Sequence, residues 1–146
     1  VIAINKEVVE ADQHQAADSI YGYALGIDLT KRDIQSEAKK KGRPWDLSKG
    51  FDQSAPISSI QPIADLEEIN NGLIALSINQ ESRQEGQLNQ MIWSPSEVIA
   101  ELSKHVTLKP GDLIFTGTPS GVGVVERGDK VEAKLNQELS LDFYIE

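Results

Sequence analysis

The chain has 146 residues and a formal net charge of −9, from 23 acidic and 14 basic side chains. Hydrophobic residues make up 39% and charged residues 25%, the balance of an ordinary globular protein with one core. The acidic excess repels phosphate backbones, so nucleic-acid binding is not expected. The absence of cysteine excludes disulfides, zinc–thiolate sites and thiol nucleophiles.

Targeting and membrane signals are absent from the sequence. No apolar run approaches the ~20 residues that span a bilayer, and neither a signal peptide nor an Asn-x-Ser/Thr site is present. We therefore expect a cytoplasmic protein with no membrane partner. The chain begins with Val1 and its single methionine is Met91, so we expect a processed chain or a piece of a longer product.

The first third of the chain alternates short apolar and polar segments. Residues 1–5 predict a strand, and residues 11–20 predict a short helix with Asp12 as its N-cap. Residues 21–29 are apolar at nearly every position, which predicts a strand buried on both faces. Residues 30–41 are polar and partly helical, with Thr30 as the predicted N-cap, and residues 42–45 break the helix.

The middle of the chain predicts an irregular stretch followed by a hairpin. Residues 50–61 are irregular, and Pro62 limits regular pairing. Residues 73–78 alternate in polarity as a strand does, and residues 81–84 return as its partner. The turn between them is Asn79-Gln80, and since glutamine tolerates positive φ poorly we expect it to be wider than two residues.

The last third predicts one helix and a closing hairpin. Residues 94–105 form the helix, capped by Ser94 or Ser96. Residues 109–112 form a tight turn into a strand at 113–116, followed by a glycine-rich loop at 117–125. Strands at 131–135 and 139–145 flank a turn at Asn136-Gln137. Together these elements predict an α+β fold, a curved mixed sheet or barrel with three short inserted helices.

Two polar segments admit both a functional and a structural interpretation. Asp28 follows an apolar run, where a carboxylate suits a hard metal ion, and Arg32 follows at a distance that suits a carboxylate clamp. A helix cap with a surface ion pair explains the same spacing and is favoured on spacing alone. Lys49 lies between Trp45 and Phe51, which favours either a partly desolvated anion donor or a lysine that extends past the rings into water.

The glycine-rich loop also has two interpretations. Residues 116–123 hold three glycines and three hydroxyls, and glycines let backbone N–H groups approach an anion closely. Neither a Walker A motif nor a dinucleotide-binding motif is present. An anion site and a tight, mobile connection are equally compatible with the sequence.

Three motifs, taken together, are more specific than any one of them. They are Gly-x-Asp-Leu-Thr-x-Arg-Asp-x-Gln from Gly26, Lys-Gly-x-Pro-Trp-x-x-x-Lys-x-Phe-Asp from Lys41, and Leu-x-Pro-Gly-Asp-Leu-Ile-x-Thr-Gly-Thr-Pro-x-Gly-Val-Gly from Leu108. This set strongly resembles the fumarylacetoacetate hydrolase family, most closely its small acylpyruvate hydrolase members. The resemblance covers the whole chain and implies one catalytic domain over residues 1–146, incomplete at its N-terminus.

The resemblance implies a metal and a substrate class. Asp28 matches the family's third metal-binding carboxylate, for Mg²⁺ or Mn²⁺, and Lys49 matches the catalytic lysine beside the metal and substrate. The implied activity is metal-dependent cleavage of a carbon–carbon bond in an acylpyruvate-type 2,4-dioxo acid. Decarboxylation of oxaloacetate and isomerisation of 2-hydroxyhepta-2,4-diene-1,7-dioate are alternative activities, which pass through the same kind of enolate. The family is commonly homodimeric.

The remaining matches concern the small anionic substrate. Arg32 and Gln35 match residues that contact the substrate or the closed lid and serve catalysis, and Gly117 and Thr118 match the loop that binds its oxo-carboxylate end. The family's other two metal carboxylates and its water-activating His–Glu pair precede the position of Val1, so we expect the chain alone to bind Mg²⁺ weakly and be inactive. A non-catalytic remnant that dimerises or binds a ligand is the alternative of another class. A carbohydrate- or anion-binding β domain explains only the loop.

Overall fold

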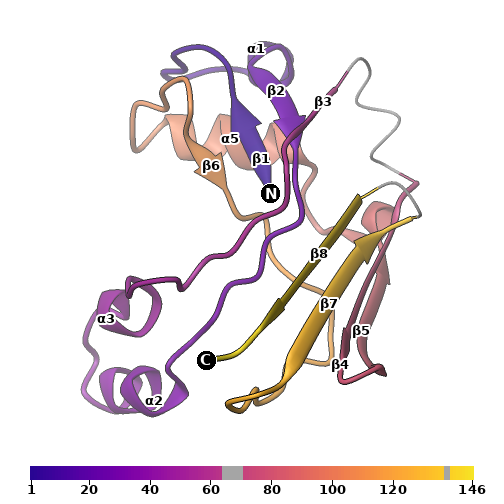
Figure 1. Cartoon of the computed structure of the whole chain (residues 1–146). Helices are drawn as coiled ribbons and strands as arrows, with labels where there is room; N and C mark the ends of the chain where they lie inside the picture. The colour runs from indigo at the N-terminus through magenta and orange to yellow at the C-terminus, as the bar shows by residue number, and fades with distance from the viewer. Residues whose placement is uncertain (64–70, 137–138) are drawn as a thin grey trace. The chain divides into compact units, whose positions relative to one another are not determined.

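The computed structural model describes residues 1–63, 71–136 and 139–146, which form two compact units (Figure 1). The first, here called the sheet unit, comprises Val1–Leu25 and Ser58–Glu146. The second, the α2–α3 unit, comprises Gly26–Ile57.

One antiparallel sheet of the sheet unit has the strand order β3-β2-β1-β6. Its strands are β1 (Ile2–Ile4), β2 (Ile20–Tyr23), β3 (Gln61–Pro62) and β6 (Leu113–Ile114). The strand predicted at residues 1–5 is confirmed. Pro62 lies in an edge strand, where a missing N–H donor is tolerated.

The strand predicted at residues 21–29 is wrong in extent and burial. β2 ends at Tyr23, and Tyr21 is 49% exposed. Ala24 and Leu25 are buried, but they lie outside the strand ladder. Their N–H groups bond to the Val1 carbonyl and the Ser58 hydroxyl instead of to a neighbouring strand. The apolar run therefore marks burial and not continuous strand pairing.

The second antiparallel sheet has the order β5-β4-β7-β8. Its strands are β4 (Leu73–Ile78), β5 (Glu81–Gln87), β7 (Lys130–Leu135) and β8 (Leu139–Tyr144). Both predicted hairpins are confirmed, although Gln137 of the second turn lies outside the described residues. Among these residues every strand pairing is antiparallel, so the expected curved mixed sheet takes the form of two antiparallel sheets within the predicted α+β class.

The expectation of a wide turn at Asn79-Gln80 is wrong. Ile78 pairs directly with Glu81, and Asn79 and Gln80 have φ of 52° and 69°. The Asn79 amide holds this two-residue turn, since its Nδ2 donates to Asp129 Oδ1 at 2.7 Å and its Oδ1 accepts from the Lys130 N–H at 2.9 Å. These bonds offset the cost of positive φ at glutamine.

In the described part of the sheet unit, capping boxes define α1 (Gln13–Ala17) and α5 (Pro95–Ser103), and a 3₁₀ turn covers Leu88–Gln90. Asp12 Oδ1 accepts from the Gln15 N–H at 2.8 Å, as predicted. Ser94, the first of the two candidate caps, holds α5 by accepting from the Glu97 N–H at 3.3 Å. None of the described helices is long and apolar enough to cross a membrane.

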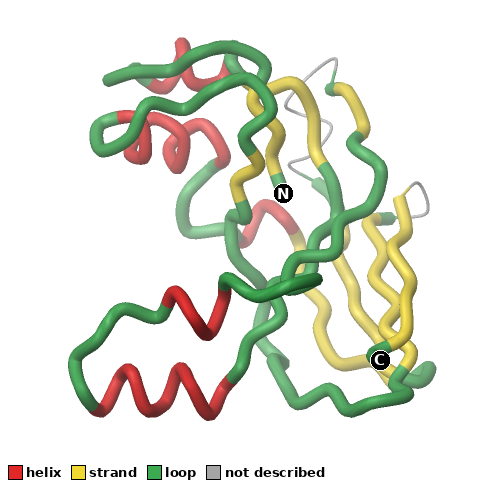
Figure 2. The backbone as a smooth tube through the Cα atoms, turned by 60° about the vertical axis from the view of Figure 1, so that its left-hand side comes forward, coloured by secondary structure: helices red, strands yellow, loops and turns green. Residues whose placement is uncertain are grey.

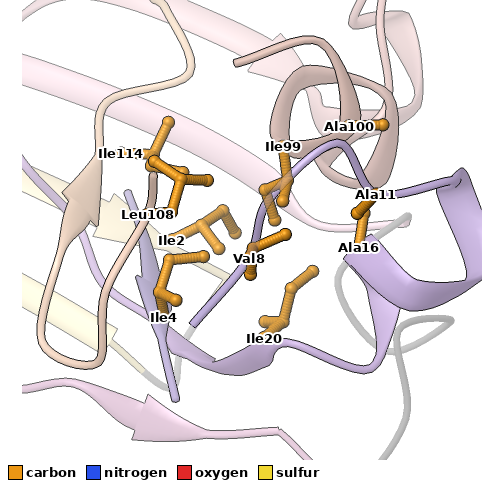
Figure 3. Close-up of a cluster of buried hydrophobic side chains, with 10 residues drawn as sticks. All are labelled: Ile2, Ile4, Val8, Ala11, Ala16, Ile20, Ile99, Ala100, Leu108 and Ile114. Atoms are coloured by element: carbon orange, nitrogen blue, oxygen red, sulfur yellow. The ribbon is translucent and has the colours of Figure 1, made fainter. Parts of the chain in front are cut away.

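The hydrophobic core lies entirely in the sheet unit. Its buried side chains come from β1, β2, β6, both capped helices and the loops between them, and they point toward one another (Figure 3). They are Ile2, Ile4, Val8, Ala11, Ala16, Ile20, Ile99, Ala100, Leu108 and Ile114. Ile99 of α5 and Ala16 of α1 are both completely buried, so both helices pack into this core.

The α2–α3 unit contains α2 (Arg32–Lys40) and α3 (Asp46–Lys49), joined by loops (Figure 2). The Ile27 and Leu29 N–H groups bond to the Pro56 and Ser54 carbonyls at 3.0 and 2.9 Å, which closes the unit at its base. Thr30 is not the N-cap of α2, so that prediction is wrong. The cap is Lys31, because the Thr30 hydroxyl donates to the Asp28 carbonyl instead.

Candidate functional site

The α2–α3 unit brings Asp28, Thr30 and Lys49 together. Lys49 Nζ donates to Asp28 Oδ2 at 2.6 Å and to Thr30 Oγ1 at 2.9 Å. The backbone sets this meeting, because the Lys31 N–H bonds to the Ser48 carbonyl at 3.0 Å and so places the end of α3 beside residues 28–31. Two side chains 21 residues apart in the sequence therefore form one polar cluster.

The Asp28–Lys49 pair remains accessible to a ligand. The Asp28 side chain is 55% exposed and the Lys49 side chain 36% exposed. An ion pair with this exposure contributes only about 0–1 kcal/mol to stability, because water competes for both charges. A ligand can therefore displace either partner at small cost.

Arg32 and Gln35 form a second contact on the first turn of α2. Arg32 Nη1 donates to Gln35 Oε1 at 2.9 Å, across the i, i+3 spacing that brings helix neighbours together. Gln35 is 5% exposed, whereas Arg32 is exposed. The buried amide orients the guanidinium, whose other N–H donors suit a carboxylate.

The aromatic surroundings predicted for Lys49 belong to other lysines. Lys31 Nζ lies 4.4 Å from the centre of the Phe51 ring, and Lys39 Nζ lies 4.6 Å from the centre of the Trp45 ring. Each distance suits a cation–π contact. Lys49 is instead engaged by Asp28 and Thr30.

Gly117 and Thr118 lie in the sheet unit, on the loop between β6 and β7. Gly117 has a φ of 112°, a backbone conformation that favours glycine. Thr118 is exposed, and its Oγ1 accepts a hydrogen bond of 2.8 Å from Gln84 Nε2 on β5. Sequence reasoning missed Gln84, because nothing in the pattern of β5 marks a partner 34 residues away.

The donors present suit one position in the shell of a divalent cation. Asp28 supplies an exposed carboxylate, the ligand that Mg²⁺ and similar hard cations prefer. Across residues 1–63, 71–136 and 139–146, no three acidic or histidine side chains gather to hold a metal. Asp28 thus fits the metal as one ligand among several, with the Lys49 ammonium as a competitor for the same oxygen.

A hollow of about 340 Å³ lies beside α1 and α5, but its carboxylates are already engaged. Of its carboxylates, Asp12 caps α1, Glu97 caps α5 and Glu101 pairs with Lys104 at 2.6 Å. None of the site residues predicted from the sequence lines it. It is therefore not the candidate site.

Comparison with known proteins establishes the family. The sequence profile of the fumarylacetoacetate (FAA) hydrolase C-terminal family matches residues 1–142. The chain belongs to the fumarylacetoacetate hydrolase family. The resemblance seen in the three motifs is thereby confirmed.

Named relatives of this family member differ in their reactions. A fumarylpyruvate hydrolase from Ralstonia sp is 43% identical over 143 residues, which cover 97% of this chain and 74% of the relative. A mitochondrial oxaloacetate tautomerase from Bos taurus is 41% identical over 145 residues, 99% of this chain and 66% of the relative.

A solved structure gives a similar picture of the fold. Fumarylpyruvate hydrolase from Pseudomonas aeruginosa, in complex with Mn²⁺ and pyruvate, has a TM-score of 0.93 and 39% identity. The match covers 99% of this chain and 62% of that protein. The chain therefore spans between 62% and 74% of the length of these three relatives.

Proposed function

We propose that the protein is a divalent-metal-dependent enzyme that cleaves a carbon–carbon bond in an acylpyruvate-type 2,4-dioxo acid. The observation that carries the proposal is the cluster of Asp28, Thr30 and Lys49, with Lys49 Nζ 2.6 Å from Asp28 Oδ2. The names of two relatives, both fumarylpyruvate hydrolases, support the substrate class, and the Mn²⁺ and pyruvate in one of them support the metal and the kind of ligand.

Each residue of the cluster has a chemical task in this reaction. A bound divalent cation, Mg²⁺ or Mn²⁺, supplies a Lewis acid that polarises the oxygens of the oxo-acid and offsets developing negative charge. Asp28 is the carboxylate that this chain offers to it. Lys49 then donates from Nζ to an oxygen of the substrate, which is the kind of preorganised charge stabilisation that lowers a barrier.

Arg32, Gln35 and the loop residues bind and orient the substrate in this proposal. The guanidinium of Arg32, held by Gln35 at 2.9 Å, pairs with a substrate carboxylate. The Gly117 backbone and the Thr118 hydroxyl serve the oxo-carboxylate end. Cationic and dipolar groups of this kind are needed because a chain of net charge −9 otherwise repels an anionic substrate.

Side-by-side turnover assays test the proposal. The complete product of the gene is given an acylpyruvate, oxaloacetate and 2-hydroxyhepta-2,4-diene-1,7-dioate with Mg²⁺ or Mn²⁺. We expect pyruvate release from the acylpyruvate to be the fastest reaction and to stop when the metal is chelated. If no acylpyruvate is hydrolysed with metal present, the proposal is wrong.

A second candidate function is chemistry on oxaloacetate. The tautomerase from Bos taurus, 41% identical, is the observation that favours it. The same groups would then stabilise an enolate of oxaloacetate without cleaving a carbon–carbon bond. Faster turnover of oxaloacetate than of any acylpyruvate would favour this candidate.

A further inference from the structure

β5 departs from regular pairing at Arg83, beside the residue that contacts the glycine-rich loop. Leu76 pairs with Gln84 and Ser77 pairs with Ser82, so Arg83 has no partner across the ladder. A bulge of this kind re-aims neighbouring side chains and is frequent at sheet edges, and β5 is an edge strand. The bulge therefore lies directly beside Gln84, which itself pairs with Leu76.

Contacts of two kinds place the loop against this bulge. Gln84 Nε2 donates to Thr118 Oγ1 and to the Pro119 carbonyl, each at 2.8 Å. The backbones also meet closely, because a Cβ on Gly121 would lie 2.0 Å from the Arg83 carbonyl oxygen. The loop therefore packs directly against the backbone of β5, at a distance that only glycine permits.

The direction of these bonds determines what Thr118 has left to offer. A carbonyl oxygen only accepts, so the nitrogen of the Gln84 amide faces Pro119, and its second hydrogen goes to Thr118 Oγ1. The Thr118 hydroxyl oxygen is thus an acceptor, and its own hydrogen remains available to donate. A hydroxyl that accepts one hydrogen bond donates a stronger one, since the bonds polarise each other.

We propose that Gln84 is a positioning residue, which holds the Thr118 hydroxyl as a hydrogen-bond donor to the carboxylate end of the oxo-acid substrate. This inference rests on the proposed function and assigns a role to a residue outside the three motifs. Gln84 acts through Thr118 and the seated loop and does not itself touch the substrate. Its loss should therefore weaken substrate binding more than it slows the chemical step.

The test is the substitution Gln84→Glu in the complete gene product. A glutamate of the same size donates no hydrogen and places a carboxylate against two oxygen acceptors. We expect KM for the acylpyruvate to rise about tenfold to a hundredfold, the loss for one hydrogen bond to a charged group, with kcat within about threefold. Gln80→Glu is the matched control, because it adds the same charge at the exposed turn of the same hairpin and should leave both constants unchanged.

A double-mutant cycle separates action through Thr118 from a general effect. Thr118→Val removes the hydroxyl and should raise KM by a similar factor. If Gln84 acts through it, adding Gln84→Glu to Thr118→Val raises KM by less than about twofold further. Effects of the two substitutions that simply multiply, or a Gln84→Glu variant with unchanged KM, would overturn the inference.

Hydrogen exchange keeps the inference testable if the proposed function fails. When even the wild type turns over no oxo-acid, the exchange rates of residues 117–123 decide. If these amides exchange several times faster in Gln84→Glu than in Gln80→Glu, Gln84 holds the loop through its hydrogen bonds to Thr118 and Pro119. The amides of α5 serve as the unaffected reference. Equal exchange in the two variants would sink the inference.

Discussion

Residues 26–57 carry seven lysines and arginines against five aspartates and glutamates, a formal charge of +2, whereas the rest of the chain carries seven against eighteen, a formal charge of −11. Their interiors differ as well. Within residues 26–57 the buried side chains are Gln35 and Ser48, both polar, whereas the sheet unit buries a hydrophobic cluster. The α2–α3 unit is thus suited to presenting charge, and the sheet unit to holding structure.

The largest expected effect comes from removing the ammonium in the α2–α3 unit. We expect Lys49→Met to lower kcat/KM by about a hundredfold to a thousandfold, the loss for one preorganised donor at developing charge. Steady-state kinetics measure kcat/KM, and urea unfolding measures the free energy of unfolding. The free energy of unfolding should fall by less than about 1 kcal/mol, because the pair with Asp28 is exposed.

Lys104→Met is the matched control for Lys49→Met. It also removes the lysine of an exposed ion pair, Glu101–Lys104, but on α5 in the sheet unit. We expect kcat/KM to stay within about twofold of the wild type. Equal losses of activity in the two variants would contradict the claim that the α2–α3 unit, and not α5, carries the lysine needed for activity.

The sheet unit should respond in the opposite sense to a core substitution. Ile99→Ala empties a fully buried position, so we expect a loss of about 2–4 kcal/mol in the free energy of unfolding. Activity per folded molecule should be retained. Ile92→Ala, at a side chain 94% exposed, removes the same atoms and should change stability by less than about 0.5 kcal/mol. Similar losses from both would contradict the placement of the core.

A smaller effect is expected at the N-terminus of α5. Ser94→Ala should lower the free energy of unfolding by about 1 kcal/mol, since the hydroxyl caps the helix. Ser140→Ala, at an exposed position of β8, is the control. Urea unfolding at neutral pH measures both, and a Ser94→Ala variant as stable as the control would contradict the cap.

The same cap predicts a pH dependence. The backbone N–H and hydroxyl of Ser94 bond to Glu97 and hold the pKa of that carboxyl below its ordinary value of 4.5. A lowered folded-state pKa stabilises the fold above pH 4.5, and this contribution is lost as the pH falls through the folded-state pKa. Glu97→Gln should flatten this part of the stability curve, and an unchanged acid limb would count against the assignment.

The smallest effect concerns the charge of the α2–α3 unit as a whole. We expect Lys40→Gln to lower kcat/KM by less than about threefold at low ionic strength and not at all at high salt, where exposed charges are screened. Kinetics at two salt concentrations provide the measurement. A loss that persists at high salt would mean a direct contact with substrate instead.

Features with local determinants were predictable from the sequence. Asp12 and Ser94 cap their helices because each acts on an N–H three residues away. The hairpin at residues 73–87 follows from alternating polarity and a short turn. Thr30 failed as a cap because its hydroxyl turned to the Asp28 carbonyl, a competition that spacing does not reveal.

Contacts between distant segments were not predictable from spacing. Lys49 was expected beside Trp45 and Phe51, its near neighbours in sequence, yet it pairs with Asp28, 21 residues away. Gln84 donates a hydrogen bond to Thr118, 34 residues away, from a position beside a β-bulge. The periodicity of the sequence does not predict that bulge. The motif resemblance predicts Asp28 and Lys49 as site residues, and only the fold shows that they form one ion pair.

The most direct measurement compares the wild type with Asp28→Asn for metal-dependent release of pyruvate from an acylpyruvate, using the complete gene product. Asparagine keeps the size of the side chain but weakens it as a metal ligand. We predict metal-dependent release by the wild type and a loss of at least about a hundredfold in Asp28→Asn, with a higher Mn²⁺ concentration needed for half-maximal rate. Release that does not depend on metal, or an Asp28→Asn variant as active as the wild type, would contradict the account.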